Sequence, residues 1–202
     1  MNQRNYQKEL DREIEGLGDV VPRVLLHACC APCSSYCLEY LSQYFAVTVF
    51  YYNPNISPAE EYERRTRELQ RLVSEMSFAH PVDVLVGAYE PDRYYEAVRG
   101  LEDEPEGGAR CTECFRLRLN EAVRTAEELG FDYVTTTLTI SPLKDAPRLN
   151  MIGEAACEGH QVRWLPSDFK KKNGYLRSIE LSREYDLYRQ DYCGCVFSKK
   201  KA

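Results

Sequence analysis

Residues 24–33 read Val-Leu-Leu-His-Ala-Cys-Cys-Ala-Pro-Cys, and this stretch decides the fold. A short apolar run leads directly into three cysteines, and residues 34–45 then carry apolar side chains at helical spacing. A strand that passes through a short loop into a helix is the unit from which parallel sheets are built. The stretch therefore predicts a β-strand, a cysteine loop and a helix.

Outward from this unit, short apolar runs and amphipathic stretches continue to alternate along the chain. Further strands are predicted at 47–52, 82–86, 131–140 and 161–165, and helices at 58–76, 92–101, 115–129, 148–157 and 175–188. Strands separated by helices of this length are joined by crossover connections. We expect an α/β fold with a doubly wound, Rossmann-like parallel sheet, in a single domain of residues 1–202 whose first 20 residues form a helical extension.

The composition fits one folded domain. The 202 residues are 44% apolar and 29% charged, and no run approaches the 18 apolar residues of a membrane-spanning helix. The N-terminus lacks the apolar run of a secretory signal, so we expect a soluble, cytoplasmic protein without a membrane partner. A net charge of −6 disfavours indiscriminate binding to nucleic acid but leaves room for a local basic patch.

Cysteine is the informative residue, with nine in the chain. Eight of them form three groups, which are Cys29/Cys30/Cys33/Cys37, Cys111/Cys114 and Cys193/Cys195, and Cys157 stands alone. An odd number of cysteines without an export signal argues against a disulfide framework and favours metal binding or redox chemistry. Because ligands bind beyond the carboxyl ends of parallel strands, we expect the first two groups and the turn at 135–145 to meet at that edge.

The first two groups together predict a four-thiolate site. Cys111 and Cys114 are three residues apart at a helix start, so both thiols reach one metal. Two of Cys29, Cys30 and Cys33 complete the set. Four thiolates hold either a structural zinc ion or an iron-sulfur cluster, and spacing alone does not decide between them. Cys33 either replaces one of the adjacent pair, holds a second metal or is a spectator beside the site.

Cys193 and Cys195 are separated only by Gly194, so a disulfide between them closes a small, strained ring that is readily reduced. This spacing predicts a redox-active dithiol, and the alternatives are two further metal ligands or an exposed tail. Cys37 and Cys157 are expected to be buried apolar residues. The loop at 27–33 lacks the glycines of a phosphate loop, so nucleotide activation is not expected there.

Six short motifs together resemble the cobalamin-independent epoxyqueuosine reductase family, QueH. They are His27-Ala-Cys-Cys-Ala-Pro-Cys33, Tyr52-Asn-Pro-Asn-Ile56, Glu61-Tyr62, Cys111-Thr-Glu-Cys114, Ser141-Pro142-Leu-Lys144 and Leu187-Tyr-Arg-Gln-Asp-Tyr-Cys-Gly-Cys195. Each motif alone is weakly specific, but six in the right order make chance similarity improbable. The resemblance runs from about residue 23 to 198.

The resemblance implies a reaction, a cofactor and a partner. The reaction is the two-electron deoxygenation of epoxyqueuosine to queuosine at the wobble position of the tRNA anticodon, the last step of queuosine biosynthesis. The family is expected to carry a 4Fe-4S cluster on cysteines that match Cys29, Cys30, Cys111 and Cys114, and a redox-active pair that matches Cys193 and Cys195. The implied fold resembles the nucleotide-binding alpha hydrolase superfamily, with thiols in place of the phosphate loop.

Our mechanistic hypothesis is that iron polarises the epoxide C–O bond, that electrons arrive through the cluster, and that the Cys193/Cys195 dithiol supplies or relays them. Alternatively, Cys33 and this pair hold an adjacent mononuclear iron. The electron donor is not identified by the sequence.

Candidates for the proton donor and for contacts with tRNA are less specific. Asp145, Asp168 and Tyr192 follow strands or adjoin cysteines, and each is also explained as a cap, a turn former or a packed phenol. Basic side chains that either contact phosphate or form a solvated surface are Arg64/Arg65/Arg67, Arg110/Arg116/Arg118, Lys170–Lys172 and Lys199–Lys201. The tyrosines chosen as stacking partners for an unpaired base are Tyr89, Tyr94 and Tyr95.

Two other functions fit parts of the pattern. One is a zinc-stabilised tRNA-binding module without redox chemistry, which predicts a colourless protein with one zinc ion. The other is a thiol–disulfide oxidoreductase that uses Cys193 and Cys195 alone and retains activity when Cys111 is changed. The resemblance favours the reductase over both.

Overall fold

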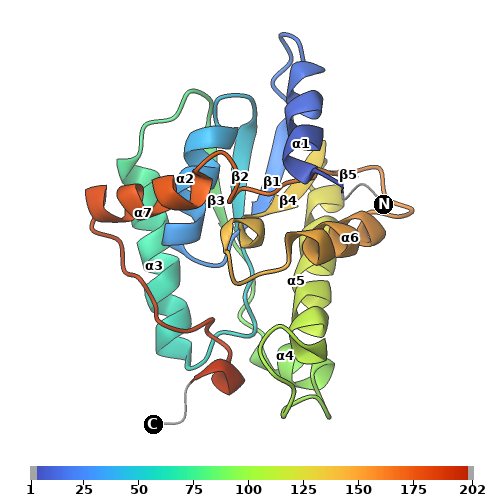
Figure 1. Cartoon of the computed structure of the whole chain (residues 1–202), viewed down its shortest axis with the longest axis vertical. Helices are drawn as coiled ribbons and strands as arrows, with labels where there is room; N and C mark the ends of the chain where they lie inside the picture. The colour runs from blue at the N-terminus through green and yellow to red at the C-terminus, as the bar shows by residue number, and fades with distance from the viewer. Residues whose placement is uncertain (1–3, 200–202) are drawn as a thin grey trace.

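A five-stranded parallel sheet lies at the centre of the computed structural model, which describes residues 4–199 (Figure 1). The strand order is β3-β2-β1-β4-β5, and every neighbouring pair is parallel. The strands are β1 (Arg23–His27), β2 (Ala46–Tyr51), β3 (Val82–Val86), β4 (Tyr133–Thr136) and β5 (Arg163–Trp164). The fold thus places the cysteine loop after the middle strand.

Helices cover both faces of this sheet. They are α1 (Tyr6–Glu15), α2 (Ala31–Leu41), α3 (Ala59–Glu75), α4 (Pro91–Ala97), α5 (Ala109–Glu128), α6 (Ala146–Ala156) and α7 (Gly174–Glu184). Alternate residues of β1 enter different apolar clusters, because Val24 and Leu26 pack with α2 and α3 whereas Leu25 packs with α5 and α6. A strand buried on both faces reads as a continuous apolar run, which is the pattern of residues 24–26. The predicted α/β fold with a doubly wound parallel sheet is confirmed.

The predicted N-terminal helix is α1, and it is tied into the core. The Asn5 side chain caps it by accepting a hydrogen bond from the Lys8 backbone N–H at 3.1 Å. Leu10 is fully buried in the apolar cluster that contains Val24 and Leu26. No helix within residues 4–199 has the length and apolar character needed to cross a membrane.

The strand expected at 131–140 is wrong in its second half. The structure ends β4 at Thr136 and continues as a 3-10 turn, η1 (Thr137–Ile140). The cause is local, because the Thr136 side chain accepts a hydrogen bond from the Leu138 backbone N–H at 3.2 Å and caps the turn. β1 supplies no partner beyond His27, which pairs with Thr136. The turn directs residues 141–144 over the carboxyl edge of the sheet.

Candidate active site

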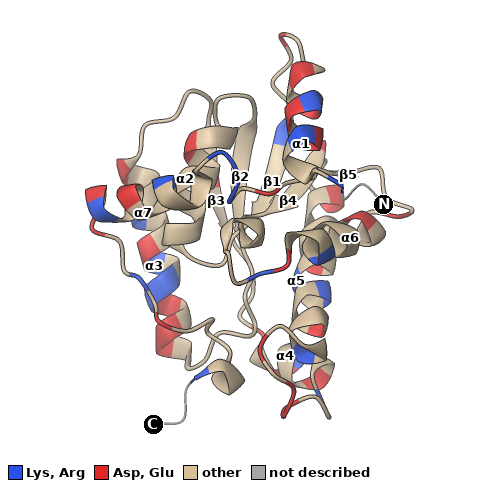
Figure 2. Ribbon diagram, in the orientation of Figure 1, with Lys and Arg blue, Asp and Glu red and all other residues tan. Residues whose placement is uncertain are grey.

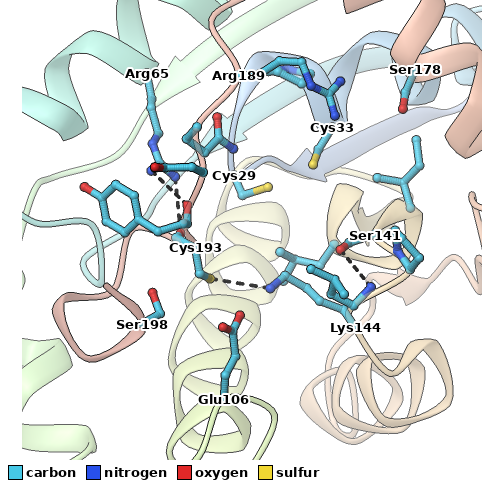
Figure 3. Close-up of a pocket in the computed structure, with 18 of the residues that line it drawn as sticks. Cys29, Cys33, Arg65, Glu106, Ser141, Lys144, Ser178, Arg189, Cys193 and Ser198 are labelled. Atoms are coloured by element: carbon cyan, nitrogen blue, oxygen red, sulfur yellow. Dashed lines mark hydrogen bonds between the residues drawn. The ribbon is translucent and has the colours of Figure 1, made fainter. Parts of the chain in front are cut away.

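A cavity of about 820 Å³ opens at the carboxyl ends of β1 and β4. Three cysteines line it, and Figure 3 shows Cys29, Cys33 and Cys193 around it. A much smaller cavity of about 20 Å³ lies beside it, and its lining includes Cys111, Cys114, Cys193 and Cys195. Because Cys193 borders both cavities, thiols from three distant segments of the chain meet at one edge of the sheet.

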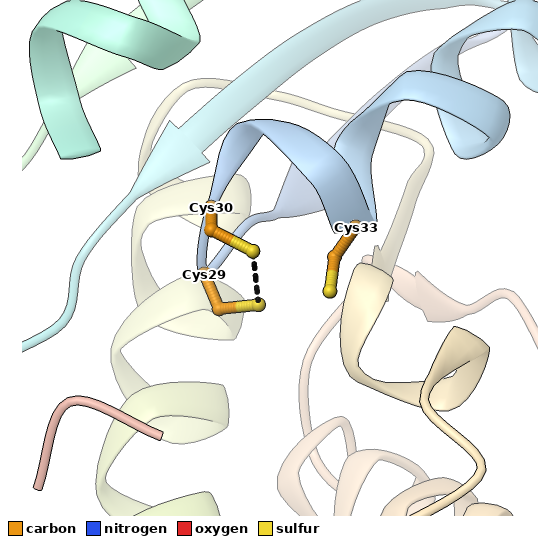
Figure 4. A group of neighbouring side chains, drawn as sticks. All are labelled: Cys29, Cys30 and Cys33. Carbon is orange, nitrogen blue, oxygen red and sulfur yellow. Dashed lines mark hydrogen bonds between the residues drawn. The ribbon is translucent and has the colours of Figure 1, made fainter. Parts of the chain in front are cut away.

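The thiol triad consists of Cys29, Cys30 and Cys33, whose Sγ atoms all lie within 4.8 Å of one another (Figure 4). The Sγ atoms of Cys29 and Cys30 are 3.6 Å apart. Cys30 is the N-cap of α2, and Cys33 lies in its first turn. The unpaired N–H groups and the dipole of a helix N-terminus favour negative charge, so the triad is placed where a thiolate is stabilised.

The electrostatic environment of the triad favours the thiolate form of one cysteine, Cys29. Hydrogen bonds from Cys30 and Cys33 hold the pKa of Cys29 well below its usual value, and the Arg118 and Lys144 charges act in the same direction. The hydrogen bond with Cys29 raises the pKa of Cys30 to about 12, and burial acts in the same direction. Metal binding deprotonates further thiols, because thiolates are the ligands.

Cys111 and Cys114 lie one turn apart on α5, so they face the same way. Cys111 Sγ accepts a hydrogen bond from the Gly107 backbone N–H at 3.2 Å. Cys114 is buried, and burial raises its pKa to about 11. It packs with Tyr94 and Cys195 in a small apolar cluster between α4 and α5. The second cysteine group is therefore next to the third.

The Cys-Gly-Cys segment is anchored rather than an exposed tail. Arg65, buried against Glu61 at 2.7 Å, donates to the carbonyl oxygens of Tyr192 and Cys193, each at 3.3 Å. Gly194 has φ +104°, and a Cβ there would lie 2.8 Å from Ile56 Cγ1. Glycine is required at this position because its backbone conformation and its surroundings both exclude a side chain.

The two thiols of this segment face different partners. Cys193 Sγ lies 3.5 Å from Lys144 Nζ, and Cys195 Sγ lies 2.8 Å from the Tyr94 hydroxyl. Both cysteines are free thiols in this structure, so the predicted disulfide is not formed in it. Their roles in redox chemistry stay predictions.

Arg118 is a buried cation without a carboxylate partner among residues 4–199. Its side chain is 1% exposed. It donates to Asn53 Oδ1 at 2.5 Å and to His27 Nε2 at 3.3 Å, and Cys114 Sγ lies 3.9 Å from its Nη1. Burial and the Arg118 charge lower the pKa of His27 to about 3, so the imidazole is neutral. A buried charge requires compensation, and thiolates are the anionic groups within reach.

The three side chains expected as proton donors form hydrogen bonds or ion pairs with other parts of the chain. The Asp145 side chain caps α6 by accepting from the Arg148 backbone N–H at 3.0 Å, and Asp168 pairs with Lys170 at 2.6 Å. Tyr192 lines the large cavity, but its hydroxyl donates to the Ser57 carbonyl oxygen at 2.9 Å. The contacts of Asp145 and Tyr192 match their explanations as a cap and a packed phenol, whereas Asp168 forms an ion pair.

Two charged side chains that sequence reasoning did not select as donors border both cavities instead. Lys144 faces Cys193, and Figure 3 shows Glu106 pointing toward this pair. Lys144 had a signal, because it ends the Ser141-Pro-Leu-Lys144 motif just after the turn at the sheet edge. Glu106 lies in a polar loop whose sequence gives no such signal.

Several side chains that were expected to contact tRNA are buried in the structure, so that prediction is wrong for them. Arg65, Arg110 and Arg118 are buried, so they are not available to phosphate. Arg110 donates to the carbonyl oxygens of the loop at 101–104. The cations that pair with neighbouring carboxylates are Arg67, Arg116, Lys170 and Lys172, whereas Arg64 stacks over the Tyr188 ring. Lys200 and Lys201 lie outside the described residues.

The structure also places the three tyrosines expected to stack on bases and the two cysteines expected to be buried. Tyr94 is 2% exposed and contacts Cys195, and Tyr89 stacks on Tyr62 with ring centroids 4.3 Å apart. Tyr95 is the one of the three expected stacking partners with substantial exposure. Cys37 is fully buried, as predicted, and Cys157 is partly buried against the cluster on the α5 side.

A family model described as epoxyqueuosine reductase QueH matches residues 24–201, which begin within β1 and include every cysteine group. The chain belongs to this family. Proteins named epoxyqueuosine reductase QueH are similar to it over most of their length. Since the members of this family are reductases, the chain is an oxidoreductase.

Three relatives show how far the similarity extends. The Streptococcus pyogenes serotype M1 protein is 50% identical over 183 residues, which cover 90% of this chain and 72% of the relative. The Staphylococcus aureus protein is 42% identical over 201 residues, covering 96% and 83%. The Thermotoga maritima protein is 35% identical over 181 residues, covering 87% and 89%. All three carry the name epoxyqueuosine reductase QueH.

Proposed function

We propose that the chain reduces the epoxide of epoxyqueuosine, at the wobble position of the tRNA anticodon, to the alkene of queuosine. Family membership supports the reaction. The observation that carries the proposal is the meeting of thiols from three chain segments around Cys193, which borders both cavities. Reductive removal of an oxygen atom needs electrons, protons and a site that limits access of water, and thiols and cations line this cavity.

The residues present fit a 4Fe-4S cluster, and we propose Cys29, Cys30, Cys111 and Cys114 as its ligands. Cys33, within the thiol triad, is an equal candidate for this set or for an adjacent mononuclear iron. The fit rests on the donor chemistry and on charge, because thiolates are the ligands of such clusters and Arg118, beside the Cys114 thiol, has no carboxylate partner within residues 4–199. When bound, the cluster supplies electrons one at a time from a low-potential donor.

The Cys193/Cys195 pair balances the reaction in electrons and protons. Oxidation of two thiols to a disulfide releases two electrons and two protons. An epoxide that accepts two electrons and two protons loses both C–O bonds, gains a C=C bond and releases its oxygen as water. Only Gly194 separates the two cysteines in the chain, and Cys193 faces the large cavity where the epoxide would lie. An external reductant then restores the dithiol.

Lys144 is proposed to face the epoxide oxygen. Its Nζ lies 3.5 Å from Cys193 Sγ, and its side chain lines both cavities. Although burial opposes the charged form, the neighbouring Cys193 and Cys29 thiols raise the pKa of Lys144 above its usual value, so the ammonium stays charged. An ammonium donates hydrogen bonds to the negative charge that develops on the departing oxygen. We expect Lys144→Met to slow turnover by about a hundredfold, measured with saturating tRNA.

The test of the proposed function is conversion of tRNA that carries epoxyqueuosine, followed by mass spectrometry of the released nucleosides. Dithionite serves as the reductant, so no protein donor is needed. Wild type is expected to form queuosine and Cys193→Ser is not, whereas Cys157→Ser, which changes a cysteine outside both cavities, keeps the full rate. Full activity of Cys193→Ser would remove the dithiol from the mechanism, and no conversion by wild type would overturn the proposed function.

A further inference from the structure

The mouth of the large cavity carries exposed apolar side chains. Leu143 is 85% exposed, the largest value among the large apolar residues that the structure describes, and it lines the cavity. Tyr175, in the first turn of α7, also lines the cavity and is 37% exposed. Exposed apolar side chains beside a cavity mark a surface that contacts a ligand.

The cavity lining is also positive, although the chain as a whole is acidic. Five of its residues are Lys or Arg, namely Arg65, Arg118, Lys144, Arg189 and Lys199, against the two carboxylates of Glu106 and Asp191. Within residues 4–199 only Arg65 of these cations forms an ion pair. By contrast, the outer faces of α3 and α5 carry both signs (Figure 2), with ion pairs one turn apart such as Arg67 with Glu63.

Two of these cations are exposed and lie at the mouth. Arg189 Nη1 donates to Ser182 Oγ at 3.0 Å, a neutral partner that leaves its charge uncompensated. Lys199 Nζ lies 4.9 Å from the centroid of the Tyr192 ring, which orients the ammonium without neutralising it. Positive charge next to an exposed aromatic ring such as Tyr175 is the combination that binds single-stranded nucleic acid, because the ring stacks on bases.

We infer that Leu143, Tyr175, Arg189 and Lys199 form a cavity rim that binds the single-stranded RNA on either side of the reacting nucleotide. Leu143 and Tyr175 contact the flanking bases, and Arg189 and Lys199 contact phosphates. The identity of this RNA, a tRNA anticodon, rests on the proposed function. A nucleotide reaches thiols inside a cavity of about 820 Å³ only when it is splayed out of its stack, and its neighbours then lie against the rim.

The experiment measures binding rather than turnover, by fluorescence anisotropy of an unmodified anticodon stem-loop RNA at several salt concentrations. A blunt RNA duplex of the same length is the second probe. Tyr175→Ala is expected to weaken stem-loop binding about tenfold and Leu143→Ala by less, because only the tyrosine ring stacks on a base, and neither variant is expected to change the salt dependence. The cation variants Arg189→Gln and Lys199→Gln are expected to lower the slope of log affinity against log salt by about 0.7 each. The duplex is expected to bind more weakly and to be insensitive to the apolar variants.

Matched controls lie away from the rim. Met151→Ala removes an apolar side chain that is 63% exposed on α6, and Arg67→Gln removes an exposed cation on α3; both are expected to bind like wild type. Rim variants that bind both probes as wild type does would overturn the inference while leaving reduction of epoxyqueuosine intact. Rim variants that slow reduction only with a protein electron donor, and not with dithionite, would also overturn it and assign the rim to that donor. Rim-dependent RNA binding without any reduction would instead overturn the proposed function alone.

Discussion

The thiol triad and the Cys193/Cys195 pair are both short cysteine clusters, but the fold holds them in opposite ways. The triad is built locally, by a strand, a loop and the first turn of α2, and its three thiols converge. The pair is held by residues far away in the chain, and its two thiols diverge toward Lys144 and Tyr94. Converging thiols suit a ligand that stays bound, whereas thiols that can leave one partner for another suit a redox cycle.

The largest effect is expected from breaking the triad. Cys29→Ser removes the thiol that is already favoured as a thiolate and is expected to lower both iron content and activity to background. Cys37→Ala is the matched control, because it lies one turn after Cys33 on α2 and is fully buried. It is expected to cost about 1 kcal/mol of stability and to keep the iron. Iron analysis checks both, and full iron in Cys29→Ser would contradict the assigned role of the triad.

The second effect separates the two clusters. Cys195→Ser is expected to lose activity as completely as the triad variant, because one thiol cannot form the disulfide that releases two electrons. It is expected to keep its iron, because the proposed cluster ligands are untouched. Iron analysis and the conversion assay on the same preparation measure both quantities. Loss of iron in Cys195→Ser would make the pair metal ligands, which is the alternative that the sequence left open.

A smaller effect is expected from displacing the pair without removing a thiol. Gly194→Ala places a Cβ against Ile56 in a backbone conformation that favours glycine, so the segment must shift. A displacement of about 1 Å lowers activity by about a hundredfold. Gly159→Ala is the control, because Gly159 also has a positive φ, +82°, but has open space around it. Equal activity in the two variants would show that the position of the pair is not critical.

The smallest effect is a loss of stability at low pH, and it is expected from His27, at the end of the strand that precedes the triad. The pKa of His27 is lowered from 6.5 to about 3 by burial and by Arg118, so the unfolded chain binds a proton that the folded chain does not. Stability is therefore lost as the pH falls below 6.5, by about 2 kcal/mol between pH 6.5 and 5. Urea unfolding at both pH values measures this loss. His27→Asn is expected to show a smaller loss, and an identical loss in the variant would assign it to other groups.

What the sequence predicts well is what local patterns determine. The unit of β1, the cysteine loop and α2 is predicted from sequence because its apolar run, its three cysteines and its helical spacing all lie within 24–45. The convergence of the cysteine groups followed from the rule that parallel strands present their carboxyl ends at one edge. The local pattern therefore predicts the elements, and the topology of a parallel sheet predicts where the cysteine groups lie.

What the sequence does not reveal depends on partners distant in the chain. Arg118 is buried because it contacts Asn53 and His27, which lie 65 and 91 residues away in the chain. The sequence pattern of α5 alone therefore predicts a surface cation at this position. Arg65 likewise reads as part of a basic run, until its contacts with Cys193 and Tyr192 are known. The end of β4 depends on one side-chain hydrogen bond from Leu138 to Thr136, which outweighs the β-branched composition of 131–140.

The central claim is that this thiol-lined edge holds an iron-sulfur cluster, and metal analysis tests it most directly. The protein is purified without oxygen, and iron, sulfide and zinc are measured with an absorption spectrum before and after dithionite. About four irons and four sulfides per chain, with a broad visible band that bleaches on reduction, are predicted, and iron beyond four would indicate the adjacent mononuclear site. One zinc ion per chain, with no sulfide and no colour, would contradict the account and make the four-thiolate site structural.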